Sequence, residues 1–203
     1  MSAPDSGRAA DAPSSSGAPA GIRCAAVGAD IIELSALRER TQVLKALAAR
    51  RGLSLPAFGR SLSVRDTLVL CVRPERWLLL TPPAAPAAAL TNWREACAGC
   101  AAVLELSSAL TASYLSGPAV REGLARGCRL DLHPEVFAPG SAAATHMAQV
   151  PVILAALPGG WLLLTPSSTA RHFGEWLAAS ARAFGLATSA DVTVGNVPGE
   201  RPP

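Results

Sequence analysis

The stretch Trp77-Leu78-Leu79-Leu80-Thr81-Pro82 decides the fold, because it recurs unchanged as Trp161-Leu162-Leu163-Leu164-Thr165-Pro166. Each copy follows an apolar run and a short turn, and each precedes a segment with helical periodicity. Two copies this far apart do not make a solenoid, which stacks many short units. The repeat therefore predicts an α+β fold with pseudo-twofold symmetry. We expect two β-β-α halves whose sheets join and whose helices pack on one side.

The elements around the first copy follow from periodicity and turn residues. Apolar positions on one helical face predict a helix over Ser35 to Arg51, which Gly52 ends. Two strands are expected at Ser61 to Cys71 and at Arg76 to Leu80. An alanine-rich helix is expected from Thr81 to about Ala98, with proline in its first turn.

The elements around the second copy repeat this order. Strands are expected at residues 103–106, 112–115, 145–157 and 161–164, the last two around the turn Pro158-Gly159-Gly160. A short helix should end near Gly127, and residues 131–141 should form a loop. The last helix is predicted over Thr169 to Phe184, with Phe173, Trp176, Leu177 and Phe184 on its inner face. Trp77 and Trp161 are expected to anchor the core.

The ends of the chain differ in composition from its middle. Residues 1–21 are rich in Ser, Ala, Pro and Gly and predict a disordered tail. Residues 191–203 share that character and predict a second flexible tail, which leaves one domain over residues 22–190. No apolar run approaches the roughly 20 residues that cross a bilayer. The five cysteines, an odd number without a secretion signal, favour free thiols in the cytoplasm.

The charge pattern gives a hint about partners. The chain carries a net charge of +3, and its basic residues are scattered arginines with a single lysine. Without a basic run and interleaved aromatic residues, nucleic-acid binding is not expected. Charged residues make up only 16% of the chain, against about 25% in an average protein. We expect much of this charge-poor surface to contact other protein chains.

Residues able to carry chemistry form no complete catalytic, cofactor or metal site. Cys97 and Cys100 form a C-x-x-C pair at the C-terminal end of a predicted helix, where the dipole disfavours a thiolate. Cys128 and His133 are close in sequence, but nothing indicates that their side chains meet. Phosphate-binding glycine motifs and metal-ligand histidine spacings do not occur. Glu105 and Asp131 are the carboxylates worth naming.

Two motifs stand between the copies of the repeat. Leu115 to Ala119 reads L-S-G-P-A, and the run Gly127 to Gly140 reads G-C-R-L-D-L-H-P-E-V-F-A-P-G. This combination resembles the signature of the γ subunit family of heterotetrameric sarcosine oxidase, and the resemblance extends from about Ile31 to Phe184. The signature positions matched are Gly127, Cys128, Leu130, Asp131, His133, Pro134, Phe137, Pro139 and Gly140.

The resemblance implies both a fold and a role. More distantly, the L-S-G-P unit resembles folate-binding domains of the aminomethyltransferase type, which have internal pseudo-symmetry. The family resemblance implies a non-catalytic assembly subunit that binds no cofactor. It implies α, β and δ partner subunits, with FAD, FMN, NAD, tetrahydrofolate and zinc on those partners. Such a complex oxidatively demethylates sarcosine to glycine and passes the one-carbon unit to tetrahydrofolate.

Two departures from the family pattern leave alternatives open. Glu105 to Leu110 contains neither the histidine nor the arginine of the family, and Ala142 to His146 replaces its glutamine-threonine. The substrate of the complex could therefore be another N-methylated amino acid. A free-standing folate-binding one-carbon enzyme is the second hypothesis, with Glu105 or Asp131 as its carboxylate. A small redox adaptor that uses Cys97 and Cys100 is the third.

Overall fold

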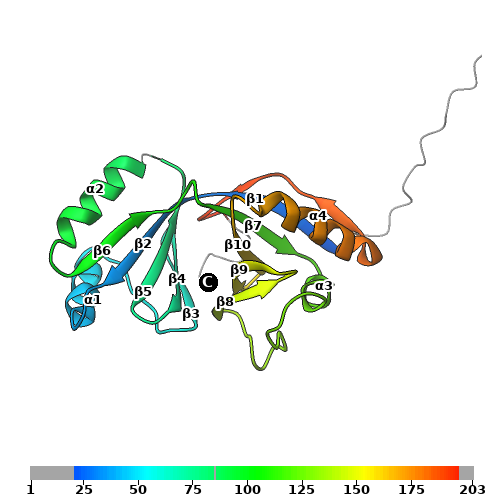
Figure 1. The fold of residues 1–203 in the computed structure, drawn as a ribbon, viewed down its shortest axis with the longest axis horizontal. Helices are drawn as coiled ribbons and strands as arrows, with labels where there is room; N and C mark the ends of the chain where they lie inside the picture. Colours follow the sequence, from blue (N-terminus) through cyan, green and yellow to red (C-terminus); the bar gives the residue numbers. More distant parts are fainter. Residues whose placement is uncertain (1–20, 85, 197–203) are drawn as a thin grey trace, which may run out of the picture.

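The computed structural model describes residues 21–84 and 86–196, which form two β-sheets packed face to face between outer layers of helices (Figure 1). The predicted tail over residues 1–21 lies almost wholly outside this part. A central apolar cluster takes side chains from both sheets, and a further cluster lies between each sheet and its own helices. The α+β fold class is confirmed.

The first four residues of the repeated hexapeptide are all apolar because its strand is buried on both faces. The copies form β5 (Arg76–Thr81) and β10 (Gly160–Pro166), each inside its sheet. Successive side chains of a strand point to opposite faces. Trp77 and Trp161 accordingly face the helices, whereas the leucines that follow them, Leu78 and Leu162, face the other sheet. Both tryptophans are buried, as predicted.

The first sheet has the order β3-β4-β5-β2-β6 and is antiparallel throughout. Its other strands are β2 (Asp30–Ala36), β3 (Arg60–Val64), β4 (Thr67–Arg73) and β6 (Ala101–Glu105). Helices α1 (Thr41–Arg50) and α2 (Pro86–Ala96) belong to this half. Leu44 and Ala48 of α1 are buried in the cluster that contains Trp77.

The second sheet has the order β11-β1-β7-β10-β9-β8, with β12 also paired to β1. Its other strands are β1 (Ile22–Gly28), β7 (Leu110–Ser116), β8 (Ala142–Met147), β9 (Val150–Leu157), β11 (Leu186–Thr188) and β12 (Val192–Thr193). Helices α3 (Val120–Ala125) and α4 (Ala170–Ala181), with the short 3₁₀ turn η1 (Arg182–Phe184), complete this half. Phe173 and Leu177 of α4 are buried beneath the helix, as predicted.

Pseudo-symmetry is present, but the expected arrangement of the halves is wrong. The strands β2, β3, β4 and β5 correspond in sheet order to β7, β8, β9 and β10. The two sheets do not join into one sheet with helices on a single side; they face each other, and helices cover both outer faces (Figure 1). The reason is that four consecutive residues of each hexapeptide, Trp-Leu-Leu-Leu, are apolar, so each sheet has two faces to bury.

The halves also differ at one edge. In the first sheet the strand next to β2 is β6, which follows α2 in the chain. In the second sheet the equivalent place beside β7 belongs to β1 from the start of the chain. The strand that follows α4 in the chain, β11, instead pairs with β1 in parallel. The β1 strand therefore ties the beginning of the domain to its end.

Four predicted elements need correction. The runs 61–71 and 145–157, each expected to be one strand, are hairpins that turn at Arg65-Asp66 and Ala148-Gln149. Arg65, Ala148 and Gln149 have positive φ, and none is a glycine. The first two helices begin later than expected, at Thr41 and Pro86, because Ser35 and Ala36 still pair in β2 and Thr81 ends β5.

The expected boundary at residue 190 is also wrong. Val192 and Thr193, placed in the flexible tail, form β12 in parallel with Val27 and Gly28 of β1. Val194 is 1% exposed and belongs to the cluster between the sheets. An apolar side chain that fills the space between two sheets outweighs the Gly/Pro character of its neighbours. The folded body therefore extends to the last described residues.

Candidate functional site

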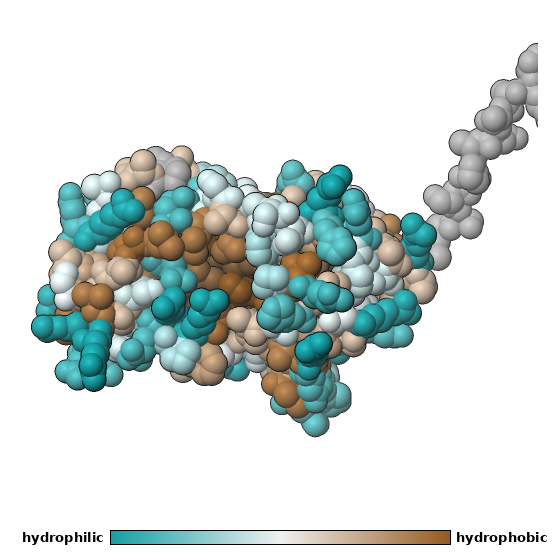
Figure 2. Space-filling view, in the orientation of Figure 1, coloured by the Kyte–Doolittle hydropathy of each residue, from teal (hydrophilic) through white to brown (hydrophobic). Residues whose placement is uncertain are grey.

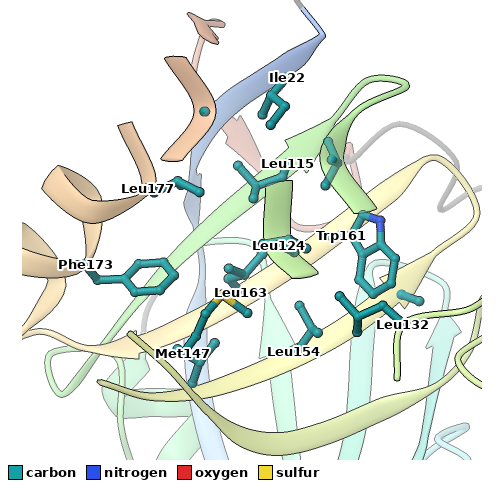
Figure 3. Close-up of a cluster of buried hydrophobic side chains, with 14 of the residues drawn as sticks. Ile22, Leu115, Leu124, Leu132, Met147, Leu154, Trp161, Leu163, Phe173 and Leu177 are labelled. Atoms are coloured by element: carbon teal, nitrogen blue, oxygen red, sulfur yellow. The ribbon is translucent and has the colours of Figure 1, made fainter. Parts of the chain in front are cut away.

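The signature run Gly127 to Gly140 connects α3 to β8 and lies along the second half of the molecule. The run has no strand or helix of its own, as predicted, but its apolar side chains enter the cluster between the second sheet and its helices. Figure 3 shows Leu132 beside Trp161 in that cluster, to which Leu124 of α3 also belongs.

The first signature residues lie where two helices come together. Gly127 lies under the ring of Trp176, and a Cβ at this position would be 2.3 Å from Cζ2 of that ring. Cys128 forms an isolated β-bridge with Met147, which attaches the run to β8. Burial raises the pKa of the Cys128 thiol. Glycine is therefore required here for close packing, and the thiol beside it is a poor nucleophile at neutral pH.

The middle of the signature is fixed by an aromatic stack. The ring of Phe137 lies nearly parallel to that of Trp161, with centroids 5.7 Å apart and an interplanar angle of 11°. The Arg121 guanidinium lies 5.2 Å from the centre of the Trp161 ring and donates a hydrogen bond to the Leu132 carbonyl. Leu130 is partly buried against the same cluster. One helix side chain thus connects the signature run to the hexapeptide.

The polar signature residues shape the run itself. A carboxylate oxygen of Asp131 accepts the backbone N–H of His133 at 2.8 Å. The His133 carbonyl accepts the backbone N–H groups of Val136 and Phe137, so a turn forms around the exposed Pro134. Asp131 and His133 also line an open depression of about 500 Å³ beside α3. Both residues therefore belong to the turn itself, in which the Asp131 side chain bonds to the backbone two residues further on, as aspartate side chains commonly do in turns.

The end of the signature joins the two halves of the fold. The Gly140 carbonyl accepts the N–H of Ser61 on β3 at 2.8 Å, and its own N–H donates to the Ala156 carbonyl. Gly140 has a φ of 86°, which favours glycine. Pro139 before it is exposed. A backbone bond from the signature to the first sheet therefore helps to hold the halves together.

The C-x-x-C pair lies at the C-terminal end of α2, as predicted, and is buried. The Cys100 N–H donates to the Cys97 carbonyl at 2.9 Å in a tight turn. Both side chains belong to the cluster beneath α1 and α2. Burial, with a smaller effect of the neighbouring Cys100, raises the pKa of Cys97 to about 11. All five cysteines are free thiols.

Glu105, the other carboxylate considered from sequence, has a local partner. It accepts the backbone N–H of Ser107 at 2.7 Å, and the Ser107 hydroxyl in turn accepts the N–H of Ile31 at 2.9 Å. Hydrogen bonds from Ser107 hold the pKa of the Glu105 carboxyl below its usual range. Glu105 therefore stays ionised and fixes the loop between β6 and β7, and it lies on the first half, away from Asp131.

A groove between the sheets was not predicted from sequence. It has a volume of about 320 Å³ and is lined by Leu78 and Leu104 of the first sheet, by Leu106 just after β6, and by Leu110 and Ile153 of the second sheet. Figure 2 shows apolar surface in the middle of the molecule, between the two halves. Leu104 is 53% exposed. The groove could not be predicted because its lining comes from strands that are distant in sequence. The exposed Leu104, in the predicted strand 103–106, was the one local indication of an apolar surface here.

A family model described as "Sarcosine oxidase, gamma subunit family" matches residues 40–183, which is most of the chain and includes the whole signature run. The chain belongs to this family. The γ-family resemblance inferred from Gly127 to Gly140 is thereby confirmed.

Curated γ-family relatives agree with this assignment. The chain is 34% identical over 137 residues to the sarcosine oxidase subunit gamma of Corynebacterium sp. strain U-96, covering 65% of this chain and 65% of that protein. It is 31% identical over 137 residues to the Arthrobacter protein of the same name, covering 65% and 66%. The chain thus matches slightly less than two thirds of the length of these curated relatives.

Solved structures support the fold of this γ-family chain. It aligns with a chain of heterotetrameric sarcosine oxidase from Corynebacterium sp. U-96, with a TM-score of 0.72 and 30% identity over 83% of this chain and 88% of that one. It also aligns with the aminomethyltransferase T of the glycine cleavage system from Bartonella henselae, with a TM-score of 0.62. That second match is 13% identical over 85% of this chain and 48% of the other, so it bears on the fold alone.

Within the described part of this γ-family chain, the residues considered for chemistry do not come together. Cys97 and Glu105 belong to the first half, whereas Cys128, Asp131 and His133 belong to the second. No group of three or more His, Cys, Asp or Glu side chains among residues 21–84 and 86–196 is placed to hold a metal ion. Over the same residues, no helix is long and apolar enough to cross a membrane.

Proposed function

We propose that this chain is a non-catalytic assembly subunit of a sarcosine-oxidase-type complex. Its partners are the α, β and δ subunits of that complex. The complex oxidatively demethylates sarcosine, or a related N-methyl amino acid, to glycine and passes the one-carbon unit to tetrahydrofolate. FAD, FMN, NAD, tetrahydrofolate and zinc are held by the partner subunits, and the assembly works in the cytoplasm.

The observation that carries the proposal is that the residues of the signature run make structural contacts. Its most specific residues pack, cap turns or join sheets: Gly127 lies against Trp176, Phe137 stacks on Trp161, and Gly140 bonds to the first sheet. Asp131 is engaged with the backbone of its own loop. A signature built from packing contacts supports an architectural role, because catalysis requires acid, base or nucleophile groups that converge on a substrate.

The low charge of the chain supports the same proposal. Only 16% of the residues are charged. The groove between the sheets adds the exposed side chain of Leu104 and the partly buried side chain of Leu110 to the surface. Exposed apolar surface in a folded protein marks interaction sites. Such a surface is expected in a subunit that is covered by larger partner subunits.

Co-purification tests the proposal directly. The chain is tagged and co-expressed with the α, β and δ subunits of its own organism. We expect three further chains and flavin absorbance to elute with it in fixed ratio, whereas the tagged chain expressed alone elutes colourless. Elution of the chain alone from the co-expression, together with saturable binding of tetrahydrofolate by the isolated chain, would replace this proposal with a free-standing folate-binding protein.

A further inference from the structure

The groove between the sheets has an apolar floor and walls. Leu78 comes from the first sheet, Leu106 from the loop directly after β6, and Leu110 and Ile153 from the second sheet. A neighbouring depression of about 350 Å³ shares Leu110 and Ile153 and continues toward β8 and β9. The two depressions also share Arg73, so they lie next to each other.

The opposite end of the same gap is closed by the chain itself. There, Val194 is buried between the sheets after β12 has paired with β1. Leu68 of β4 lies in the same central cluster, and Val72, four residues further along that strand, belongs to this cluster and also lines the groove. An extended apolar segment thus closes one end of the gap, and none of the residues 21–84 and 86–196 forms such a segment at the other end.

Positive charge is concentrated at the mouth of the groove. Arg73 and Arg76 face each other directly across the β4–β5 hairpin. A carboxylate oxygen of Glu33 lies 3.7 Å from the Arg76 guanidinium and compensates the charge of that arginine. Among residues 21–84 and 86–196, no carboxylate lies within ion-pair distance of Arg73. Like charges directly opposite on a hairpin destabilise it, so a carboxylate from outside the chain would relieve the pair.

We propose that this groove binds an extended segment of a partner subunit that carries an apolar side chain next to an aspartate or glutamate. The apolar side chain lies against Leu104 and Leu110, and the carboxylate pairs with Arg73. This inference rests on the proposed function, because it assigns the partner-binding surface of the same subunit. Bidentate arginine–carboxylate geometry gives such a contact orientation as well as affinity.

Charge argues against a second copy of this chain as the occupant. A symmetric contact would bring the Arg73 and Arg76 pair of one copy toward the same pair of the other, with one glutamate on each side. The groove lining contains no Phe, Tyr or Trp on which a nucleic-acid base would stack. An acidic and apolar protein segment fits both the walls and the mouth.

The test compares affinities for the purified α, β and δ assembly. Arg73→Glu reverses the free charge, Leu104→Asp places a charge on the apolar wall, and Arg73→Lys keeps the charge. Arg171→Glu, on the exposed side of α4, is the matched control. Arg73 and Leu104 are exposed, so circular dichroism is expected to show unchanged folding in all variants.

We expect Arg73→Glu and Leu104→Asp to weaken binding at least tenfold, with Arg73→Lys and Arg171→Glu within threefold of the wild type. A photo-crosslinking residue in place of Leu104 should label one partner peptide that contains Asp or Glu within three residues. If the wild type binds the assembly and both groove variants bind within twofold of it, the groove is not the binding site, and the proposed function still stands. Failure of the wild type to bind the assembly would overturn both. A concentration-dependent dimer lost in the same variants would assign the groove to a second copy.

Discussion

Gly127→Ala is the simplest test of the hypothesis that the signature residues serve packing and not catalysis. A Cβ at this position would lie 2.3 Å from Cζ2 and 2.8 Å from Cη2 of Trp176. Ordinary contact begins near 3.4 Å, so the indole must move by about 1 Å. It cannot move freely, because Trp176 packs on Phe173 with ring centroids 5.5 Å apart and lies against the core cluster.

The size of the effect follows from two opposing contributions. Overpacking a core costs about 1–3 kcal/mol. Replacing glycine reduces the entropy of the unfolded chain and returns about 0.4–1 kcal/mol. We therefore expect the free energy of unfolding to fall by about 1–2 kcal/mol, measured by urea denaturation of the full chain with tryptophan fluorescence.

Gly174→Ala is the matched control, since it makes the same chemical change in an open position. Nothing lies within 4 Å of the added Cβ, and the residue is in the interior of α4. Alanine in place of a helical glycine should stabilise the chain by about 0.5–1 kcal/mol. In a Trp176→Leu background, Gly127→Ala should cost at least 1 kcal/mol less than in the wild type. Equal or greater stability of Gly127→Ala than of the wild type would refute the reasoning.

Three further predictions concern other parts of the fold. Phe137→Ala, which removes the ring stacked on Trp161, should cost about 3–5 kcal/mol in urea unfolding, and Val136→Ala, at an exposed neighbour, should change stability by less than about 0.5 kcal/mol. Because folding raises the pKa of Cys97 from 9.0 to about 11, the stability tied to this thiol is complete below pH 9 and declines as pH rises toward 11. Its alkylation by iodoacetamide at pH 8 should be slow until urea unfolds the chain, and fast labelling of the native chain would contradict its burial. Val194→Asp should destabilise the chain by more than about 2 kcal/mol, whereas Asn196→Asp should have little effect in the same thermal melt.

The sequence predicted the parts of the fold that repeat or carry strong local signals. The hexapeptides placed two buried strands and the pseudo-symmetry, because an all-apolar strand must be covered on both faces. The two apolar faces of these strands could also have predicted the face-to-face arrangement. One face of each strand can be covered by helices, and the other must then be covered by the second sheet. The last helix was also predicted nearly to its ends, because Phe173 and Leu177 lie on one helical face.

The missed features depend on contacts distant in sequence or on unusual turns. The two-residue turns Arg65-Asp66 and Ala148-Gln149 contain neither glycine nor proline, although Arg65, Ala148 and Gln149 adopt left-handed backbone conformations. The pairing of β12 with β1 joins the last described residues to the first, and neither segment indicates the other. No local pattern could show that Leu104 and Ile153 would line one groove. The signature run was identified by resemblance, and only the structure shows its packing role.

The kcat of the assembled complex tests the non-catalytic role of this chain most directly. The chain is prepared with Glu105→Gln, Asp131→Asn and His133→Asn together, which removes the solvent-accessible groups that the sequence singled out as able to act as acid or base; Glu105 is partly exposed and the other two are exposed. It is assembled with the α, β and δ subunits, and turnover of sarcosine is measured per intact complex. We predict a kcat within about twofold of the wild type. A loss of about 100-fold or more, the contribution of a general acid or base, in a complex of unchanged composition would contradict the account.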